Sequence, residues 1–282
     1  MKCRLCHAEL DPDKAKCKKC GAWTNAAPIE KNESTDPNVE ADGTVTLDKV
    51  TSAERDRIHT GLGLDKTFGG GIVRTGVTML GGLPGAGKTT MLLQLAGRLA
   101  TVTGLETLYI AAEQHLPEIR MIADRIESEN RARVRMLQAM GGAVNINAVL
   151  EKRIFGAMIL DSLQGLANDD HEVSMDMLVA LKDYAVAKQA PAIVICQVTK
   201  GEELAGLMKF QHKVDTLMML APEDADDEDN DIRCMSAQKN RFGPAFSASE
   251  TYYAMTAKGL IYLPNGPIDH EEDDEEENDE EE

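Results

Sequence analysis

One eight-residue motif constrains the fold of this chain more than any other feature. Residues 82–89 read GLPGAGKT and fit the pattern G-x-x-x-x-G-K-[ST]. An apolar run at residues 76–80 precedes the motif and an amphipathic stretch follows it, which are the strand and the helix that a phosphate-binding loop requires. A glycine-rich turn can also serve only as a tight connection, but the Lys-Thr pair and both flanks favour a site for the phosphates of a nucleoside triphosphate.

The loop residues receive specific expected roles. Lys88 would reach the β- and γ-phosphates, and Thr89 would bind Mg²⁺. Nucleotide contacts are expected along the whole loop, from Gly82, Leu83, Pro84, Gly85, Ala86, Gly87, Lys88, Thr89 and Thr90. No guanine-reading N-K-x-D motif follows in a suitable place, so ATP is the expected nucleotide.

Apolar runs alternate with polar stretches of helical length through much of the chain. The helix after the loop carries an apolar stripe made of Leu92, Leu95, Ala96 and Leu99. Later apolar runs fall at residues 107–112, 157–160, 192–196, 214–220 and 252–255. The alternation predicts an α/β fold with a sheet that is parallel at least in part. From Val214 onward the connections shorten, which predicts consecutive strands joined by hairpins.

Three polar residues that follow predicted strands are candidates for chemistry on the nucleotide. Asp161 would hold Mg²⁺ through water. Glu113 would be the base that orients the attacking water. Gln197 would sense the γ-phosphate and pass its presence to the loop that follows. A single polar residue at a strand end is often only a solvated terminus, but three that converge on a phosphate-binding loop support one another.

Four cysteines within the first 20 residues form two C-x₂-C pairs, Cys3 with Cys6 and Cys17 with Cys20. Two such pairs present four thiolates to one ion and predict a closed, structural Zn²⁺ site. Disulfides or a redox pair are the alternatives, and a cytosolic setting disfavours both. We therefore expect a zinc ribbon at residues 1–25, a linker at 26–48, a nucleotide-binding domain at 49–267 and a disordered acidic tail at 268–282.

The formal net charge of −18 comes from two acidic blocks. Residues 269–282 hold 12 acidic residues and residues 223–231 hold 7, and the rest of the chain is nearly neutral. The terminal block predicts a disordered tail that keeps the protein soluble, competes with DNA for a binding channel or recruits a basic partner. No apolar run is long enough to span a membrane and the N-terminus has no signal-peptide core, so we expect a cytoplasmic protein.

Several motifs, in order along the chain, carry a resemblance to a known family. They are the cysteine knuckle at residues 17–23, the approach at 60–73, the phosphate-binding loop, the DSLQ block at 161–164 and, above all, the KNRFG block at 239–243. Together they resemble the bacterial RadA (Sms) family of DNA repair proteins, collinearly over nearly the whole chain except the acidic tail. The resemblance implies a RecA-like ATPase core that forms a homo-oligomer, with a hexameric ring expected. It further implies binding of single-stranded DNA, branch migration of recombination intermediates, and a recombinase or replication protein as a partner.

The resemblance also implies roles for five basic residues. Lys239 and Arg241 would act across a subunit boundary, on the triphosphate of a neighbour or on DNA; by themselves they would be a surface basic pair near a hairpin. Lys200, Lys209 and Lys213 would contact DNA phosphates from the loop that follows Gln197.

Two features depart from the family pattern. The acidic tail stands where family members continue into a Lon-protease-like domain that helps to hold the hexamer, so a less stable ring is expected. The segment after Asp161 is short and acidic where a first DNA-facing loop would lie, so weaker DNA binding is expected.

Three functional hypotheses follow. The first is an ATPase that assembles on single-stranded DNA and remodels recombination or replication intermediates. The second is a nucleotide-gated interaction module without motor activity, whose acidic tail recruits a basic replication protein. The third is a regulatory switch that hydrolyses ATP slowly and binds no DNA.

Overall fold

The computed structural model describes residues 45–49, 57–126, 128–140, 146–168, 170–197, 210–224 and 231–267. The chain divides into two compact units, Met1–Ser52 and Ala53–Glu282. In the first unit the described residues contain a single 3₁₀ turn, η1 (Leu47–Lys49), whose side chains are exposed. The expected zinc ribbon with Cys3, Cys6, Cys17 and Cys20, most of the linker and the acidic tail lie outside the described residues.

The second unit alternates helices and strands and then ends in strands alone. In chain order, its elements are β1 (Arg57–Ile58), α1 (Leu64–Thr67), β2 (Ile72–Val73), β3 (Val77–Gly81), α2 (Lys88–Thr103), β4 (Thr107–Ala111), α3 (Leu116–Arg125), η3 (Arg131–Arg133), β5 (Val134–Gln138), α4 (Ile146–Lys152), β6 (Ala157–Asp161), α5 (Leu163–Ala167), α6 (His171–Lys188), β7 (Ala192–Ile195), β8 (Thr216–Pro222), β9 (Ile232–Asn240), β10 (Phe246–Thr256) and β11 (Gly259–Leu263).

A nine-stranded sheet with the order β11-β10-β9-β8-β3-β7-β6-β4-β5 forms the centre of this unit. Strands β3 to β8 pair in parallel, and β8 to β11 pair as antiparallel neighbours. The expectation of a partly parallel α/β sheet that ends in hairpins is therefore confirmed. The apolar runs did not reveal β5, β9 or β11, because these strands lie toward the ends of the sheet and carry more partly exposed and polar residues.

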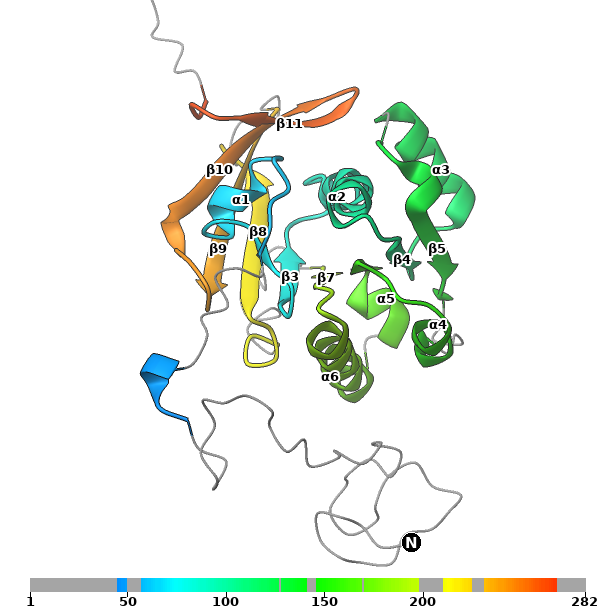
Figure 1. Cartoon of the computed structure of the whole chain (residues 1–282). Coiled ribbons are helices and arrows are strands. Elements are labelled where there is room, and N and C mark those ends of the chain that lie inside the picture. The colour runs from blue at the N-terminus through cyan, green and yellow to red at the C-terminus, as the bar shows by residue number, and fades with distance from the viewer. Residues whose placement is uncertain are drawn as a thin grey trace, which may run out of the picture. The chain divides into compact units, whose positions relative to one another are not determined.

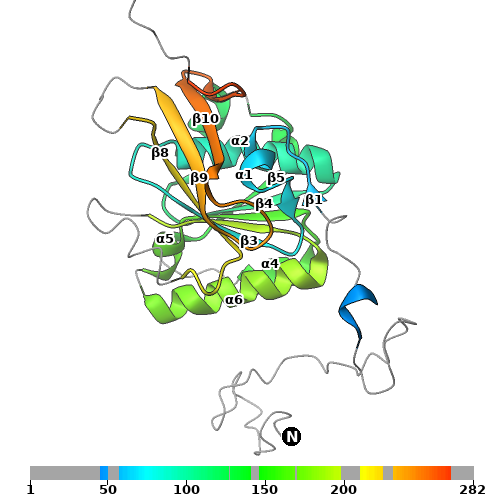
Figure 2. The ribbon, with the colours of Figure 1, turned by 90° about the vertical axis from the view of Figure 1, so that its left-hand side faces the viewer.

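Helices cover both faces of the sheet. In Figure 1, α2 and α3 lie above it and α4, α5 and α6 lie below it, and Figure 2 shows the same layers from the side. The predicted stripe of α2 is confirmed, since Leu92, Leu95, Ala96 and Leu99 are each at most 2% exposed. Two apolar clusters result, one between α2 and the sheet and one between α6 and the sheet.

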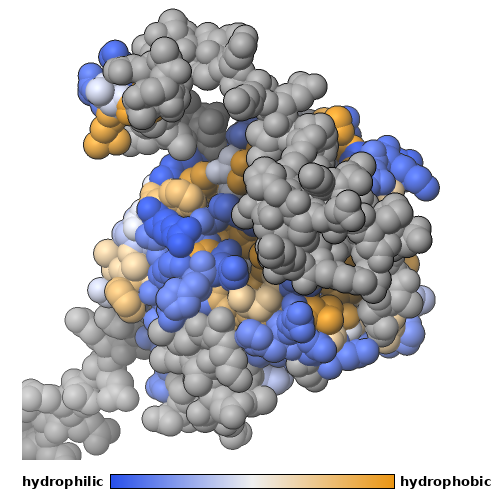
Figure 3. Space-filling model, turned by 90° about the horizontal axis from the view of Figure 1, so that it is seen from below, coloured by the Kyte–Doolittle hydropathy of each residue, from blue (hydrophilic) through white to orange (hydrophobic). Residues whose placement is uncertain are grey.

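The outer face of α6 is turned away from the sheet. Figure 3 views the molecule from this side and shows polar side chains interspersed with separate apolar ones. Val173, Val179 and Val186 of α6 are among the exposed apolar residues. In the part of the chain that the structure describes, no helix combines the length and the apolar character needed to cross a membrane.

The register of the parallel strands defines two edges of the sheet. Leu80 of β3 pairs with Ile195 of β7, and Ala111 of β4 pairs with Asp161 of β6, so these strands end together. We call this the carboxyl edge; it carries residues 82–89, 113, 161 and 197. The opposite, amino edge carries the residues around Val77, where β3 begins, and the backbone of Asp215 is bonded to Val77 there.

Candidate nucleotide-binding site

The predicted phosphate-binding loop joins β3 to α2 at the carboxyl edge. Gly82, Gly85 and Gly87 have φ angles of 152°, 81° and 97°, which side-chain-bearing residues rarely adopt. Two of these glycines are also crowded: a Cβ at Gly82 would lie 2.3 Å from the oxygen of Leu220, and one at Gly87 would lie 2.8 Å from Cε of Met255. The loop therefore needs glycine for its conformation and for the close approach of β8 and β10.

Lys88 begins α2 and folds back over the loop. Its Nζ donates hydrogen bonds to the carbonyl oxygens of Gly82 and Leu83, at 2.6 and 2.8 Å. Burial lowers the pKa of Lys88, and the carboxylates of Asp161 and Glu113 oppose that shift. The ammonium group is thus held at the mouth of the loop, where phosphate oxygens would be its natural acceptors.

Asp161 ends β6 and is only 4% exposed. Its Oδ2 accepts hydrogen bonds from the hydroxyl groups of Thr89, at 2.9 Å, and Tyr109, at 2.7 Å. Burial raises the pKa of Asp161, and the two hydrogen bonds oppose that effect. The site therefore joins the first turn of α2 to the end of β6 through one carboxylate oxygen.

Tyr109 is a site residue that the sequence did not single out. It lies inside the apolar strand β4 and is completely buried. Burial, followed by the nearby charge of Asp161, raises the pKa of Tyr109 well above its usual value, so the phenol stays a donor at neutral pH. The available signal was a tyrosine inside an otherwise apolar run, because a buried hydroxyl needs a partner.

Glu113 and Gln197 lie at the same edge, as their positions after β4 and β7 predict. Both residues are exposed. The backbone of Gln197 is bound at both polar groups by the side chain of Gln164, whose Nε2 donates to the Gln197 oxygen at 2.9 Å and whose Oε1 accepts from the Gln197 nitrogen at 3.1 Å. The DSLQ block thus contributes a second residue, Gln164, which the sequence left without a role.

Lys239 and Arg241 lie at the amino edge, opposite the edge that carries the phosphate-binding loop. Lys239 Nζ donates to the Val214 oxygen at 2.8 Å and also to the Gln211 oxygen. Arg241 pairs with Asp215 at 3.2 Å, and Lys182 pairs with the same buried carboxylate at 2.5 Å. Since β3 has five residues, about 16 Å of strand separates the two edges.

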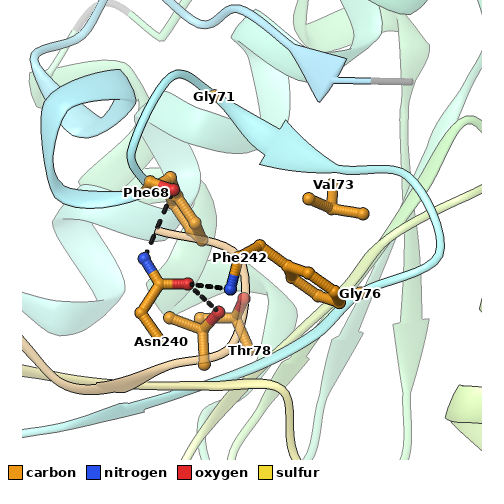
Figure 4. Close-up of a pocket in the computed structure, with 8 residues that line it drawn as sticks. Phe68, Gly71, Val73, Gly76, Thr78, Asn240 and Phe242 are labelled. Carbon is orange, nitrogen blue, oxygen red and sulfur yellow. Dashed lines mark hydrogen bonds between the residues drawn. The ribbon is translucent and has the colours of Figure 1, made fainter. Parts of the chain in front are cut away.

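The other residues of the KNRFG block build the hairpin (Figure 4). Asn240 Nδ2 donates to the oxygens of Phe68 and Pro244, and its Oδ1 accepts from the nitrogen of Phe242 and the hydroxyl of Thr216. The pocket that Asn240 and Phe242 line holds about 10 Å³, room for a single water. This part of the block is therefore structural, and it presents its two basic neighbours.

The structure describes one of the three lysines that were predicted to contact DNA. Lys213 is exposed, whereas Lys200 and Lys209 lie outside the described residues. Within the described ranges, no group of three or more His, Cys, Asp or Glu side chains could hold a metal ion.

The phosphate-binding loop, the carboxylates at the same edge and the strand order together define the class of protein. The family model described as "ATPase: KaiC" matches residues 58–148. The crystal structure of the KaiC-like protein PH0186 from Pyrococcus horikoshii superposes with a TM-score of 0.60 at 16% identity, covering 74% of this chain and 99% of that one. The second unit therefore has the RecA-like, KaiC-type fold of a P-loop ATPase domain.

Relatives found by sequence similarity indicate a more specific group of proteins than the fold does. The chain is 28% identical to the DNA repair protein RadA of Campylobacter jejuni over 93% of its length, 28% to that of Escherichia coli over 93%, and 32% to that of Rickettsia bellii over 88%. These matches cover 60%, 59% and 56% of the relatives, respectively, so the chain spans less than two thirds of their length. The resemblance to RadA that the motifs indicated is confirmed.

Proposed function

We propose that this chain is a cytoplasmic ATP-hydrolysing enzyme of DNA repair that binds single-stranded DNA and remodels or branch-migrates recombination intermediates. The observation that carries the proposal is the convergence of Lys88, Thr89, Asp161, Glu113 and Gln197 at one edge of a KaiC-type sheet. The similarity to RadA proteins supports DNA repair as the setting.

The donor set at Asp161 fits a magnesium ion. The hydroxyl of Thr89 and the carboxylate of Asp161 are hard oxygen donors, and their 2.9 Å hydrogen bond brings them to one point. Mg²⁺, when bound, offsets the negative charge of the β- and γ-phosphates. Tyr109 donates to Oδ2 of Asp161 and so orients the carboxylate that would hold the ion.

The remaining groups at the carboxyl edge would act on ATP itself. Lys88 exchanges its two loop carbonyls for oxygens of the β- and γ-phosphates, and the first turn of α2 offers its N–H groups to the same phosphates. Glu113 accepts the proton of the water that attacks the γ-phosphate. Gln197 hydrogen-bonds the γ-phosphate and reports its loss to the segment that follows.

Lys239 and Arg241 act on the ATP of a neighbouring subunit. The separation of the two sheet edges supports this role, because neither side chain can span the strand length between the amino edge and its own phosphate loop. A guanidinium supplied by a neighbour stabilises charge on the transferring phosphoryl group and makes turnover depend on assembly. We therefore propose a homo-oligomer, with a hexameric ring as the expected form.

The test is ATP turnover with and without single-stranded DNA across a range of salt concentrations. Stimulation that weakens as salt rises is expected, because contacts to phosphates release counterions. The intact chain is compared with a variant that ends at Pro267; a larger response in the variant makes the acidic tail a competitor of DNA. ATP binding without any DNA response in either form overturns the DNA-remodelling proposal.

The zinc ribbon is a separate proposal. Cys3, Cys6, Cys17 and Cys20 together hold one structural Zn²⁺, with no position open for chemistry. Metal analysis of the purified protein should find one zinc per chain, and the double variant Cys17→Ser, Cys20→Ser should lose it. Full zinc content in that variant contradicts the assignment.

A further inference from the structure

The short helix α5 contacts three strand ends that carry proposed site residues. It follows Asp161 directly, and the hydroxyl of Ser162 caps it by accepting from the nitrogen of Gly165 at 3.3 Å. Gly165 packs on the end of β4 so closely that a Cβ there would lie 2.5 Å from the oxygen of Ala112, the residue before Glu113. Gln164 reaches in another direction, to β7 and Gln197.

The contact between Gln164 and Gln197 has the form of a two-point clamp. The side-chain amide of Gln164 pairs with the backbone N–H and C=O of Gln197 as a neighbouring strand would, and Nε2 also lies 3.1 Å from Sγ of Cys196. The last sheet bond of β7 joins the nitrogen of Cys196 to the oxygen of Leu80. Gln164 thus fixes one residue more than the sheet does.

That extra residue is Gln197, the proposed contact of the γ-phosphate. Gln197 is exposed, and the clamp holds the backbone from which its side chain projects. The clamp comes from a helix that begins next to Asp161, so the positions of the carboxylate and of Gln197 are mechanically linked.

From this geometry we infer that Gln164 is a positioning residue that transmits the state of the nucleotide site to Gln197. The inference rests on the proposed function for its kinetic consequence, but not for its structural one. A glutamine is suited to the task because its amide supplies one donor and one acceptor at the spacing of a backbone amide. Glutamate keeps the acceptor and loses the donor, and methionine keeps the length and loses both.

The experiment compares the full-length protein with its Gln164→Glu and Gln164→Met variants. Gln189→Glu is the matched control, since Gln189 is exposed at the end of α6 and its side chain bonds locally, to the oxygen of Val186. Hydrogen exchange is followed on the peptide that contains the amide of Gln197, with and without a non-hydrolysable ATP analogue. Binding of a fluorescent ATP analogue and steady-state ATP turnover are measured in parallel.

We expect nucleotide to protect the Gln197 peptide in the wild-type protein and in the control. Gln164→Met, which removes both contacts, should lose that effect, whereas Gln164→Glu should keep part of it, because its carboxylate still accepts from the Gln197 nitrogen. We also expect kcat to fall about tenfold, as for other groups that act through a neighbour, while KM and analogue binding change little. Equal exchange protection in all four proteins overturns the inference, even if none of them hydrolyses ATP. A loss of analogue binding that matches the loss of kcat also overturns it, because a merely structural role would produce that pattern.

Discussion

The two edges of the central sheet hold their functional residues in opposite ways. At the carboxyl edge, Lys88 is bonded to carbonyls of its own loop, and Glu113 and Gln197 are exposed. At the amino edge, Arg241 and Lys182 share the buried carboxylate of Asp215, whose oxygen also accepts from the nitrogen of Val77. One edge therefore offers groups that can exchange partners for a ligand, whereas the other places Arg241 and Lys182 through internal ion pairs.

The difference shows how one domain can serve two sites. This anchoring suits the proposed role of the hairpin, which is to present Lys239 and Arg241 in a fixed direction to another subunit. The exposed side of Arg241 supports this view: its side chain is 53% exposed despite its ion pair, while Asp215 is 4% exposed. A guanidinium in this position keeps donors for a second acceptor.

The largest expected effect is that of Arg241→Ala. We expect ATP turnover to fall about 10³-fold, as when an arginine finger is removed, with ATP-analogue binding unchanged. Arg153→Ala is the control, because Arg153 is an equally exposed arginine that pairs with Glu106. Turnover by the assembled protein is the measurement.

A mixing experiment tests whether Arg241 acts on the ATP of a neighbouring subunit. Arg241→Ala subunits keep an intact phosphate loop, and Lys88→Ala subunits keep an intact Arg241. Mixing the two inactive proteins should restore part of the turnover if the arginine serves a neighbour. Mixtures that stay inactive although co-assembly is demonstrated would break the proposed division between the edges.

The next effect concerns the ion pairs of Asp215 with Lys182 and Arg241 at the amino edge. Lys182→Met should lower the free energy of unfolding by about 2 kcal/mol, because it leaves the buried Asp215 with a half-exposed guanidinium as its main charged partner. Arg241→Ala should cost less, since that side chain is the more exposed of the two cations. Urea unfolding of both variants is the measurement. The reverse order would show that Arg241, not Lys182, contributes more to the stability of the Asp215 ion pairs.

The comparison of edges also explains what the sequence could predict. The phosphate loop, Asp161 at the end of β6 and the residues after β4 and β7 were placed at the correct edge, because parallel strands deliver their carboxyl ends to one edge and an apolar run marks each strand. Tyr109 and Gln164 were missed because their roles depend on contacts across the sheet, Tyr109 with Asp161 and Gln164 with Gln197. Local pattern does not encode such pairs.

The roles of the amino-edge residues Lys239 and Arg241 were predicted only from the resemblance to a known family. Nothing in the spacing of Lys239 and Arg241 reveals that they share an edge with Lys182, more than 50 residues earlier in the chain. Asn240 likewise joins Phe68 to the turn at Pro244, a contact between segments far apart in sequence. Long-range hydrogen bonds of this kind become visible only in the folded chain.

A smaller effect is expected at Tyr109. Tyr109→Phe removes the donor that holds Oδ2 of Asp161, and we expect turnover to fall about tenfold with little change in fold. Tyr184→Phe makes the same change near the amino edge, where the hydroxyl accepts from the nitrogen of Phe155. That control should cost about 1 kcal/mol of stability and leave turnover intact. Equal turnover losses in both variants would contradict the assignment of Tyr109 to the site.

The smallest effect is one of stability, and its sign separates buried from exposed carboxylates. Because burial raises the folded-state pKa of Asp161, the native state binds this proton more tightly than the unfolded chain does. The resulting stability is fully present below the unfolded-state pKa and is lost as the pH rises through the folded-state pKa. Above the folded-state pKa the ionised carboxylate therefore destabilises the ligand-free protein.

Asp161→Asn should accordingly abolish turnover yet stabilise the ligand-free protein at pH 7, by up to about 1 kcal/mol. The gain should shrink as the pH falls toward the folded-state pKa of Asp161. Asp124→Asn is the control of opposite sign, since a hydrogen bond from Arg120 lowers the pKa of this exposed carboxyl and its charge stabilises the fold above the unfolded-state pKa. Thermal unfolding of both variants across pH decides the matter: if Asp161→Asn is the less stable protein at pH 7, the ionised Asp161 stabilises the ligand-free fold, and the carboxyl edge is anchored by its charge as the amino edge is.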